Sequence, residues 1–191
     1  MIHEVIIITI SQDNLVHVAP MGIKMDDKHL YISPFKPSKT LDNLLSMNKA
    51  TINFTDDTRV FAGIVTGEKK DWPLIENNSF GIPILKNTNT HYDVTVIDIN
   101  DDKTRPKIKC DIIEKKIHKP FLGFNRAQFS VIEAAVLASR LGMISTEKII
   151  MEINYLKIGI DKTSGPNELE AWKWINKKIN SFISKENKKN G

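Results

Sequence analysis

The sequence has 191 residues, of which 41% are hydrophobic and 26% charged, with a formal net charge of +4. Such a chain supports one well-buried globular domain with an appendage. Three lysines lie within residues 185–191, so the remaining charge is too weak to indicate a nucleic-acid surface. A single cysteine, Cys110, excludes an internal disulfide and a cysteine-based zinc site. The apolar run Val5 to Ile8 is short and lacks a basic leader, so we expect a cytoplasmic protein with neither signal peptide nor membrane span.

Short β-strand patterns dominate the first part of the chain. The isoleucine-rich run 2–10 predicts a buried strand, and the turn cluster 11–14 joins it to a second strand at 15–19. Pro20 and Gly22 are expected to interrupt this second strand. Further strands are predicted at 29–33, 50–54, 92–99 and 108–112, with a bulge where the alternation changes parity at Ile113 and Ile117. Six or seven strands with little βαβ alternation indicate an antiparallel barrel.

Helical patterns interrupt and then follow these strands. Short helices are predicted at 40–48 and 58–65, before an irregular crossing or lid segment at 66–90. After Pro120 the period changes, and three helices are predicted with starts near Asn125, Ser145 and Pro166. We therefore expect a β-barrel over residues 1–120 and a helical portion over 121–185, packed on the barrel or at a dimer interface. The tail 186–191 is expected to be disordered.

One loop offers a phosphate-binding chemistry. Lys36, Ser38, Lys39 and Thr40 follow a strand pattern within a proline-containing loop and stand where a helix is about to start. Helix N-termini bind phosphate readily, because their first N–H groups are unpaired and the dipole end is positive. The alternative is structural: Thr40 is simply the N-cap of the helix, and both lysines are solvated.

Other chemistry-bearing patterns are sparse. The histidines never fall into a metal-ligand spacing, although three of them lie on predicted neighbouring strands, and we expect no metal site. No nucleophile, Walker or Rossmann motif occurs, so no catalytic residue is assigned. Asn125 and Gln128 resemble a helix capping box. Arg126 stands in the first turn of an apolar helix, where the helix dipole disfavours a cation. An arginine at this position is easier to explain if its guanidinium pairs with an acid or an anionic ligand.

Four short motifs, taken in order, resemble an uncharacterised group of FMN-binding split-barrel proteins, the DUF447 type. They are Ala19-Pro20-Met21-Gly22, Ser33 to Thr40 with Asn43, Asn53-Phe54-Thr55-Asp56-Asp57, and Gly123-Phe124-Asn125-Arg126-Ala127. The group is related to flavin reductases, flavoredoxin and pyridoxamine-phosphate oxidases, and the resemblance runs from Glu4 to Trp174. After Pro120 the sequence departs from the classical flavin reductases and is similar to the uncharacterised group alone.

The resemblance implies a six-stranded antiparallel Greek-key split barrel, a homodimer, and FMN near the subunit interface. It also implies residue roles. Phosphate contacts would come from Ser33, Lys36, Ser38, Lys39, Thr40 and Asn43. The flavin ring would be lined by Ala19, Pro20, Met21 and Gly22. Asn53, Phe54 and Thr55 would lie beside the flavin, and Asn125 and Arg126 near the cofactor or substrate.

The leading hypothesis is an FMN-dependent oxidoreductase, similar to flavin reductases, with a nicotinamide or deazaflavin electron donor. Flavin chemistry needs few acid–base residues from the protein, because the cofactor carries the electrons. A non-catalytic FMN-binding dimer, or a protein whose helical portion docks a partner, fits the same sequence. A link to methanopterin-type one-carbon metabolism rests on association alone. Neither nucleic acid nor membrane is expected as a partner.

Overall fold

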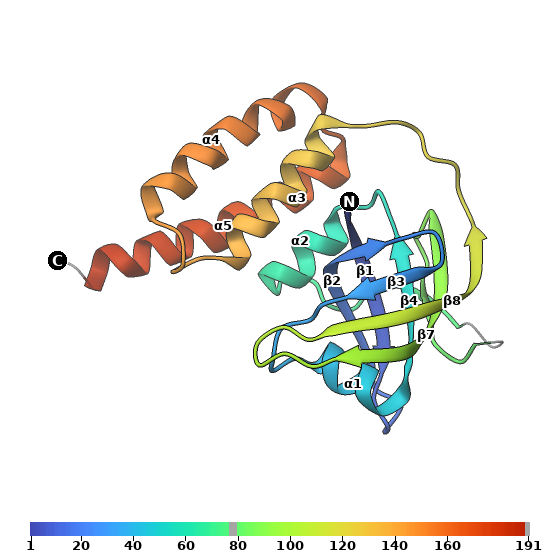
Figure 1. The fold of residues 1–191 in the computed structure, drawn as a ribbon. Coiled ribbons are helices and arrows are strands. Elements are labelled where there is room, and N and C mark those ends of the chain that lie inside the picture. Colours follow the sequence, from blue (N-terminus) through green and yellow to red (C-terminus); the bar gives the residue numbers. More distant parts are fainter. Residues whose placement is uncertain (77–79, 190–191) are drawn as a thin grey trace. The chain divides into compact units, whose positions relative to one another are not determined.

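The computed structural model describes residues 1–76 and 80–189, and the chain divides into two compact units. The barrel unit consists of Met1–Asp56 and Asp71–Phe121. The helical unit consists of Asp57–Lys70 together with the chain from Leu122 onward. Figure 1 shows the elements of both units.

Six antiparallel strands close the barrel. They are β1 (Ile2–Ile10), β2 (Val16–Met25), β3 (His29–Ile32), β4 (Lys49–Phe54), β7 (Thr90–Asn100) and β8 (Lys107–Ile117), in the spatial order β1-β2-β3-β8-β7-β4. The helix α1 (Lys39–Met47) connects β3 to β4, which pairs with β1. Three consecutive strands with the fourth beside the first form a Greek key, so the predicted fold class is confirmed.

The barrel core consists of aliphatic side chains that alternate along the strands. Val5 and Ile7 of β1 join Leu30, Ile52 and Ile108 in one buried cluster. The intervening β1 residues Ile6 and Ile8 are fully buried as well. Strand β1 is therefore buried on both faces, which explains its continuous apolar sequence.

The segment 66–90, predicted as an irregular crossing or lid, contains a two-stranded ribbon. Strands β5 (Leu74–Ile75) and β6 (Ile84–Leu85) pair antiparallel, and residues 77–79 of the same prediction lie outside the described residues. The backbone N–H of Leu85 donates to the side chain of Asn53 at 2.8 Å, and the Thr51 hydroxyl donates to the carbonyl of Pro83 at 2.7 Å. Strand β4 thus holds the β6 end of the ribbon through side chains.

Strand β2 does not end at Pro20, contrary to the sequence prediction. It runs to Met25, and Pro20 pairs with Ile6 of β1. The pairing of β2 with β3 covers Ile23 to Met25, so Pro20 lies in a stretch with one edge outside that ladder, where proline is tolerated. The predicted bulge is confirmed at Ile113, because the register with β7 shifts across this residue.

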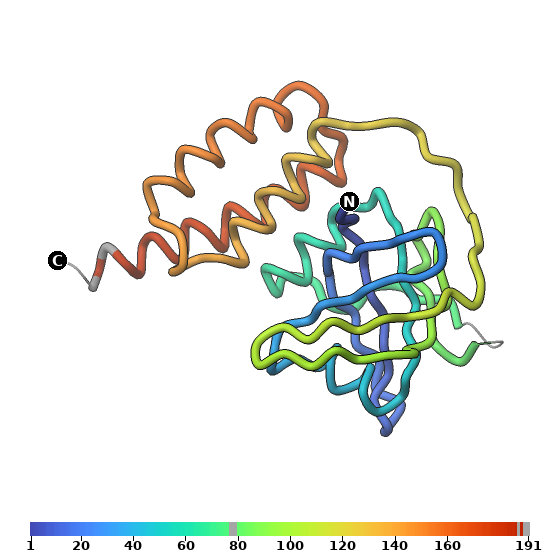
Figure 2. Tube along the Cα trace, viewed as in Figure 1, coloured from blue at the N-terminus to red at the C-terminus, as the bar shows by residue number. Residues whose placement is uncertain are grey.

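Four helices build the other unit: α2 (Arg59–Thr66), α3 (Arg126–Ser139), α4 (Thr146–Thr163) and α5 (Pro166–Lys189). The trace of α3, α4 and α5 can be followed in Figure 2. Small alanines of α3 pack with larger side chains such as Ile149, Leu156 and Trp172, and Ala62 of α2 belongs to the same core. That shared core explains why residues 57–70 group with these helices and not with the barrel expected over 1–120.

The C-terminal helix is longer than predicted. Helix α5 continues to Lys189, so residues 186–189 of the expected disordered tail are helical, and residues 190–191 lie outside the described residues. None of the described helices is both long enough and apolar enough to cross a membrane.

Candidate functional site

The predicted phosphate loop leads directly into the first turn of α1. Ser38 is the N-cap: its backbone is extended, and its hydroxyl accepts a hydrogen bond from the Leu41 N–H at 3.3 Å. The alternative that Thr40 caps the helix is wrong, because Thr40 lies within the first turn and is 2% exposed. First-turn N–H groups have no carbonyl partner inside a helix, so the positive end of α1 begins at Lys39.

A cation from a distant turn also reaches this loop. Arg105, between β7 and β8, donates from Nε to the carbonyl oxygen of Ser33 at 2.8 Å. Its guanidinium lies 4.7 Å from the centre of the Phe35 ring, within the range of a cation–π contact. Arg105 was not predicted as a site residue, since nothing in the local pattern of a strand-connecting turn points to a loop some seventy positions earlier.

The ammonium group of Lys36 is paired within the protein. It contacts the carboxylate of Asp101, and this bond lowers the pKa of Asp101. The backbone N–H of Lys36 donates to the carbonyl of Thr104 at 2.9 Å. Lys36 therefore anchors the loop to the β7–β8 turn, and its charge is already offset by a carboxylate.

Helix α1 is fixed to the barrel beside a histidine. The Asn43 side chain donates to the Thr9 hydroxyl at 2.9 Å, and Thr9 is directly opposite His17 in the pairing of β1 and β2. Burial lowers the pKa of His17, and the positive charge of Lys39 lowers it further. His17 thus senses the charge at the start of α1. His17 was not predicted as a site residue, because its proximity to Lys39 depends on the fold.

The predicted flavin-side residues of β4 are engaged inside the protein. Asn53 is fully buried; its amide nitrogen donates to the carbonyl of Ile6 at 3.2 Å, and its oxygen accepts the Leu85 N–H. The Thr55 hydroxyl donates to the carbonyl of Asn87 at 2.9 Å. Phe54 packs against Tyr92, with ring centroids 4.9 Å apart. In this structure these side chains hold the ribbon segment and the barrel core.

The segment Ala19 to Gly22 lies on the part of β2 that extends beyond its pairing with β3. Met21 faces the barrel core, and Gly22 faces the opposite way. A Cβ atom added at Gly22 would lie 2.9 Å from Cγ2 of Ile2 and 3.4 Å from Oε1 of Glu4. Glycine therefore permits close packing of β1 on β2 here, and the other backbone edge of the segment stays outside the β2–β3 ladder. Helix α1 packs on the same two strands.

Asn125 and Arg126 belong to the helical unit. The predicted cap is confirmed: Asn125 accepts from the N–H groups of Ala127 at 2.8 Å and Gln128 at 3.1 Å, and its amide donates to the carbonyl of Thr163 at 3.0 Å. Arg126 is exposed in the first turn of α3. A role for either residue in cofactor binding stays a prediction.

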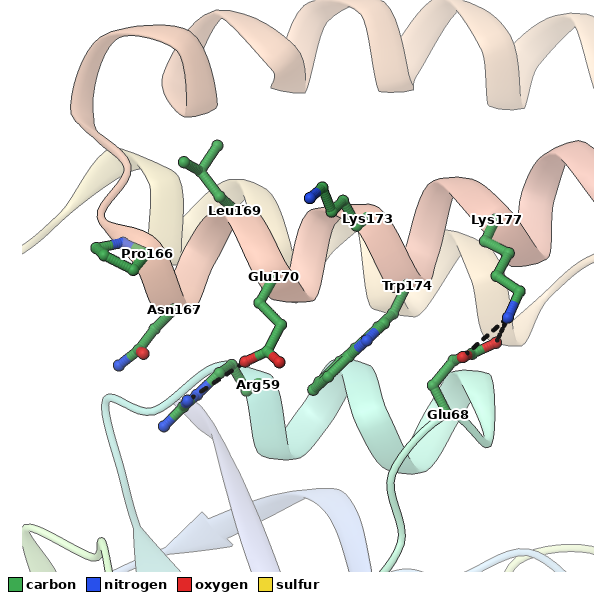
Figure 3. Close-up of a pocket in the computed structure, with 9 residues that line it drawn as sticks. All are labelled: Arg59, Glu68, Pro166, Asn167, Leu169, Glu170, Lys173, Trp174 and Lys177. Atoms are coloured by element: carbon green, nitrogen blue, oxygen red, sulfur yellow. Dashed lines mark hydrogen bonds and ion pairs between the residues drawn. The ribbon is translucent and has the colours of Figure 1, made fainter.

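The helical unit contains an open groove between α2 and α5, about 810 Å³ in volume (Figure 3). Trp174 lies along it, and Arg59 and Glu170 form an ion pair at 3.4 Å across it. Arg59 also binds Asp57 at 2.7 Å, and hydrogen bonding to that carboxylate raises the pKa of Arg59. Most charges of this groove are thus satisfied by one another, which favours a structural network between the two helices.

Family models match most of the chain. The model described as "Protein of unknown function (DUF447) N-terminal domain" matches residues 3–119, and that described as "Protein of unknown function (DUF447)" matches residues 125–177. No curated protein matches the sequence significantly.

Solved structures with the same fold come from flavin-related proteins. An FMN-bound DUF447 protein from Methanosarcina mazei has a TM-score of 0.78 and 22% identity, covering 93% of this chain and 94% of that chain. A flavoredoxin from Methanosarcina acetivorans has a TM-score of 0.54 and 15% identity, covering 64% of this chain and 72% of that chain. The flavin reductase PheA2 has a TM-score of 0.51 and 20% identity, covering 62% and 81%. At identities this low, the TM-scores show a common fold and no more.

Proposed function

This chain belongs to the DUF447 family, and from that premise we propose that it binds FMN in the corner formed by β2, the 33–40 loop and α1. The observation that carries the proposal is the cationic approach to α1: Lys39 stands at the positive end of the helix, and Arg105 binds Ser33 of the loop that leads into it. The FMN-bound relative from Methanosarcina mazei, which shares the fold over most of both chains, supports the same ligand.

The donors of this corner fit a phosphate dianion. Lys39 would supply an ammonium group and Arg105, beside the loop, a guanidinium, and both groups can form charge-assisted hydrogen bonds with phosphate oxygens. Thr40 is buried, so its contribution would be its first-turn N–H group and not its hydroxyl. Ser38 and Asn43 would act indirectly, because one caps α1 and the other fixes it to Thr9.

The ring of the flavin would lie along the backbone of Ala19 to Gly22. This stretch of β2 keeps one edge outside the β2–β3 ladder, and peptide groups at such an edge can bind a planar ring with polar edges. Asn53 would contribute by holding the neighbouring ribbon in place. Bound FMN supplies one- and two-electron redox chemistry, while the protein provides position and electrostatics.

The finer proposal is a flavin-dependent oxidoreductase of the flavin reductase type, with a nicotinamide or deazaflavin donor. Flavoredoxin and flavin reductase among the proteins of similar fold support it. Anaerobic mixing of the FMN-loaded protein with reduced nicotinamide or reduced deazaflavin should bleach the flavin absorbance. Retention of the oxidised spectrum with both donors would contradict oxidoreduction with these donors and leave FMN binding standing.

The binding proposal is tested by titration with two flavins. Lys39→Met should weaken FMN binding about ten-fold or more, since one charge-assisted contact is worth roughly 1.5–3 kcal/mol. Riboflavin lacks the phosphate, so its affinity should change far less. Lys28→Met, at the exposed turn before β3, is the matched control and should leave both affinities unchanged. Equal losses for FMN and riboflavin, or no flavin binding to the wild type, would overturn the proposal.

We further propose that the protein forms a two-fold dimer. Helix α4 carries a stripe of exposed apolar side chains, Met151, Tyr155 and Ile158, at positions three and four apart, and such a face is stabilised when a partner covers it. Sedimentation at low micromolar concentration should give a species of twice 21.7 kDa. A purely monomeric protein would contradict this proposal.

A further inference from the structure

A carboxylate and two imidazoles follow one another in the barrel unit, and the two imidazoles are hydrogen-bonded. His91 on β7 has its Nδ1 atom 2.7 Å from Nε2 of His118, which follows β8. The other nitrogen of His91, Nε2, lies 3.6 Å from Oδ1 of Asp93. Asp93 and His91 are 1% and 2% exposed, whereas His118 is exposed to solvent. The chain therefore leads from a buried carboxylate to the protein surface.

The chain is held by regular backbone structure. His91 and Asp93 are two residues apart on β7 and lie directly opposite Lys116 and Glu114 of β8. The N–H of His118 donates to the carbonyl of Asn89 at 2.7 Å, which fixes the exposed ring beside His91. The two ring planes differ by only 23°, so a hydrogen bond can lie in the plane of both rings, as lone-pair geometry requires.

The buried carboxylate decides the direction of this hydrogen bond. A neutral imidazole has one donor and one acceptor nitrogen. If His91 donated from Nδ1, its Nε2 would present a bare lone pair to Asp93. The opposite tautomer places a proton on Nε2, facing the carboxylate, and makes Nδ1 the acceptor from His118. Nε2 of His91 is buried without a hydrogen-bond partner in residues 1–76 and 80–189, and only a proton there gains from the nearby negative charge.

We propose that Asp93, His91 and His118 form a proton relay whose exposed end, Nδ1 of His118, takes a proton from a bound group or from solvent. When Nδ1 of His118 is protonated, the proton on its Nε2 can pass to Nδ1 of His91. His118 is then neutral again, with its proton moved to Nδ1, and His91 is an imidazolium beside the Asp93 carboxylate. One proton has entered the chain, and the reverse steps return it. The chemistry served is deprotonation and reprotonation of an O–H or N–H group.

Several charges face the relay besides Asp93. Burial lowers the pKa of both imidazoles, and Lys116 lowers both further, while Asp93 and Glu114 raise that of His91 and Lys119 lowers that of His118. On the β4 side, His91 lies opposite Asn53, a neutral amide. Both rings are thus neutral at pH 7, which leaves the relay ready to accept a proton.

Nuclear magnetic resonance of the ¹⁵N-labelled full chain tests the tautomers. At pH 7.5 we expect protons on Nε2 of both His91 and His118, with both Nδ1 atoms unprotonated. A proton on Nδ1 of His91 would reverse the hydrogen bond and overturn the proposal.

The rate of proton uptake by His91 tests the relay itself. Line shapes near the titration midpoint give the exchange rate, and His118→Gln should slow it at least ten-fold, because the surface end of the chain is lost. His29→Gln is the matched control: His29 also has a nitrogen 3.5 Å from a carboxylate, that of Asp111, and its removal should leave His91 unchanged. An unchanged exchange rate in a folded His118→Gln protein would overturn the relay. If His118→Gln does not fold, the tautomers measured in the wild-type protein still test the proposed direction of the hydrogen bond.

Discussion

The side-chain nitrogen of Asn43 lies 2.9 Å from the hydroxyl oxygen of Thr9, and this hydrogen bond joins α1 to β1. Both residues are buried, so removing either partner leaves an unsatisfied polar group. Thr9→Val and Asn43→Ala should each lower the free energy of unfolding by about 1–3 kcal/mol. The double variant should lose less free energy of unfolding than the sum of the two single losses, because the two residues form one interaction.

Urea denaturation of the four proteins in this cycle measures the effect. Lys28→Met, at the exposed turn before β3, serves as the control and should change stability by less than about 0.5 kcal/mol. Strictly additive losses would show that Asn43 and Thr9 do not stabilise one another.

FMN binding should raise the pKa of His17. Burial and the charge of Lys39 hold this pKa below its usual range, and a phosphate dianion placed near Lys39 would favour the protonated ring. Riboflavin should produce no such rise, as read from the histidine resonances during a pH titration. Lys39→Met should raise the same pKa without ligand. An FMN-loaded protein with the His17 midpoint unmoved would argue against a phosphate at this helix end.

Stability should fall as the pH is lowered through about 6.5, the usual pKa of histidine. The pKa values of His17, His91 and His118 are all depressed in the folded chain, chiefly by burial. Unfolded imidazoles therefore bind protons first, and the unfolded state gains as pH drops. This contribution is fully present above the unfolded pKa and declines below it. Guanidinium denaturation between pH 7.5 and 5 measures the slope, which His91→Gln should reduce; a wild-type curve flat over this range would refute the prediction.

Gly159 of α4 should not tolerate a larger residue. A Cβ atom there would lie 2.5 Å from Oγ of Ser130 and 3.0 Å from the carbonyl oxygen of Arg126, both on α3. Gly159→Ala should therefore destabilise the helical unit by about 1–3 kcal/mol despite the better helix propensity of alanine. Asn154→Ala, exposed on the same helix, should be neutral or slightly stabilising. Thermal unfolding followed by circular dichroism compares the two, and equal melting temperatures would contradict the close packing.

Local patterns predicted the elements well where neighbouring residues determine them. The alternation of β8, including the parity change at Ile113, follows from side-chain packing on a pleated strand. The cap at Asn125 is equally local, because its oxygen binds N–H groups two and three residues later. Sequence could not predict that Ser38 and not Thr40 caps α1, since serine and threonine are both good N-cap residues and only the backbone angles distinguish the two positions.

Features that depend on contacts between distant parts of the sequence could not be predicted from local patterns. Pro20 lies inside β2 because the β3 ladder stops short of it, which no local pattern encodes. Arg105 meets Ser33, and Asn53 meets Leu85, across separations that only the barrel topology brings together. The predicted loop was correctly placed at the start of α1. Which of its cations could bind a ligand was not predictable, because Lys36 pairs with Asp101 in the turn between β7 and β8.

Helix α2 belongs to the core of α3, α4 and α5, although the ribbon and two barrel strands separate it from them in sequence. During synthesis α2 therefore emerges well before the helices that bury Ala62, so this side chain can be buried only after those helices have been made. Until then the apolar run Val60 to Val65 is without its packing partners in the growing chain. A fragment that ends at residue 121 would contain α2 but not the helices that bury it. To produce the barrel alone, residues 57–70 would therefore have to be removed as well.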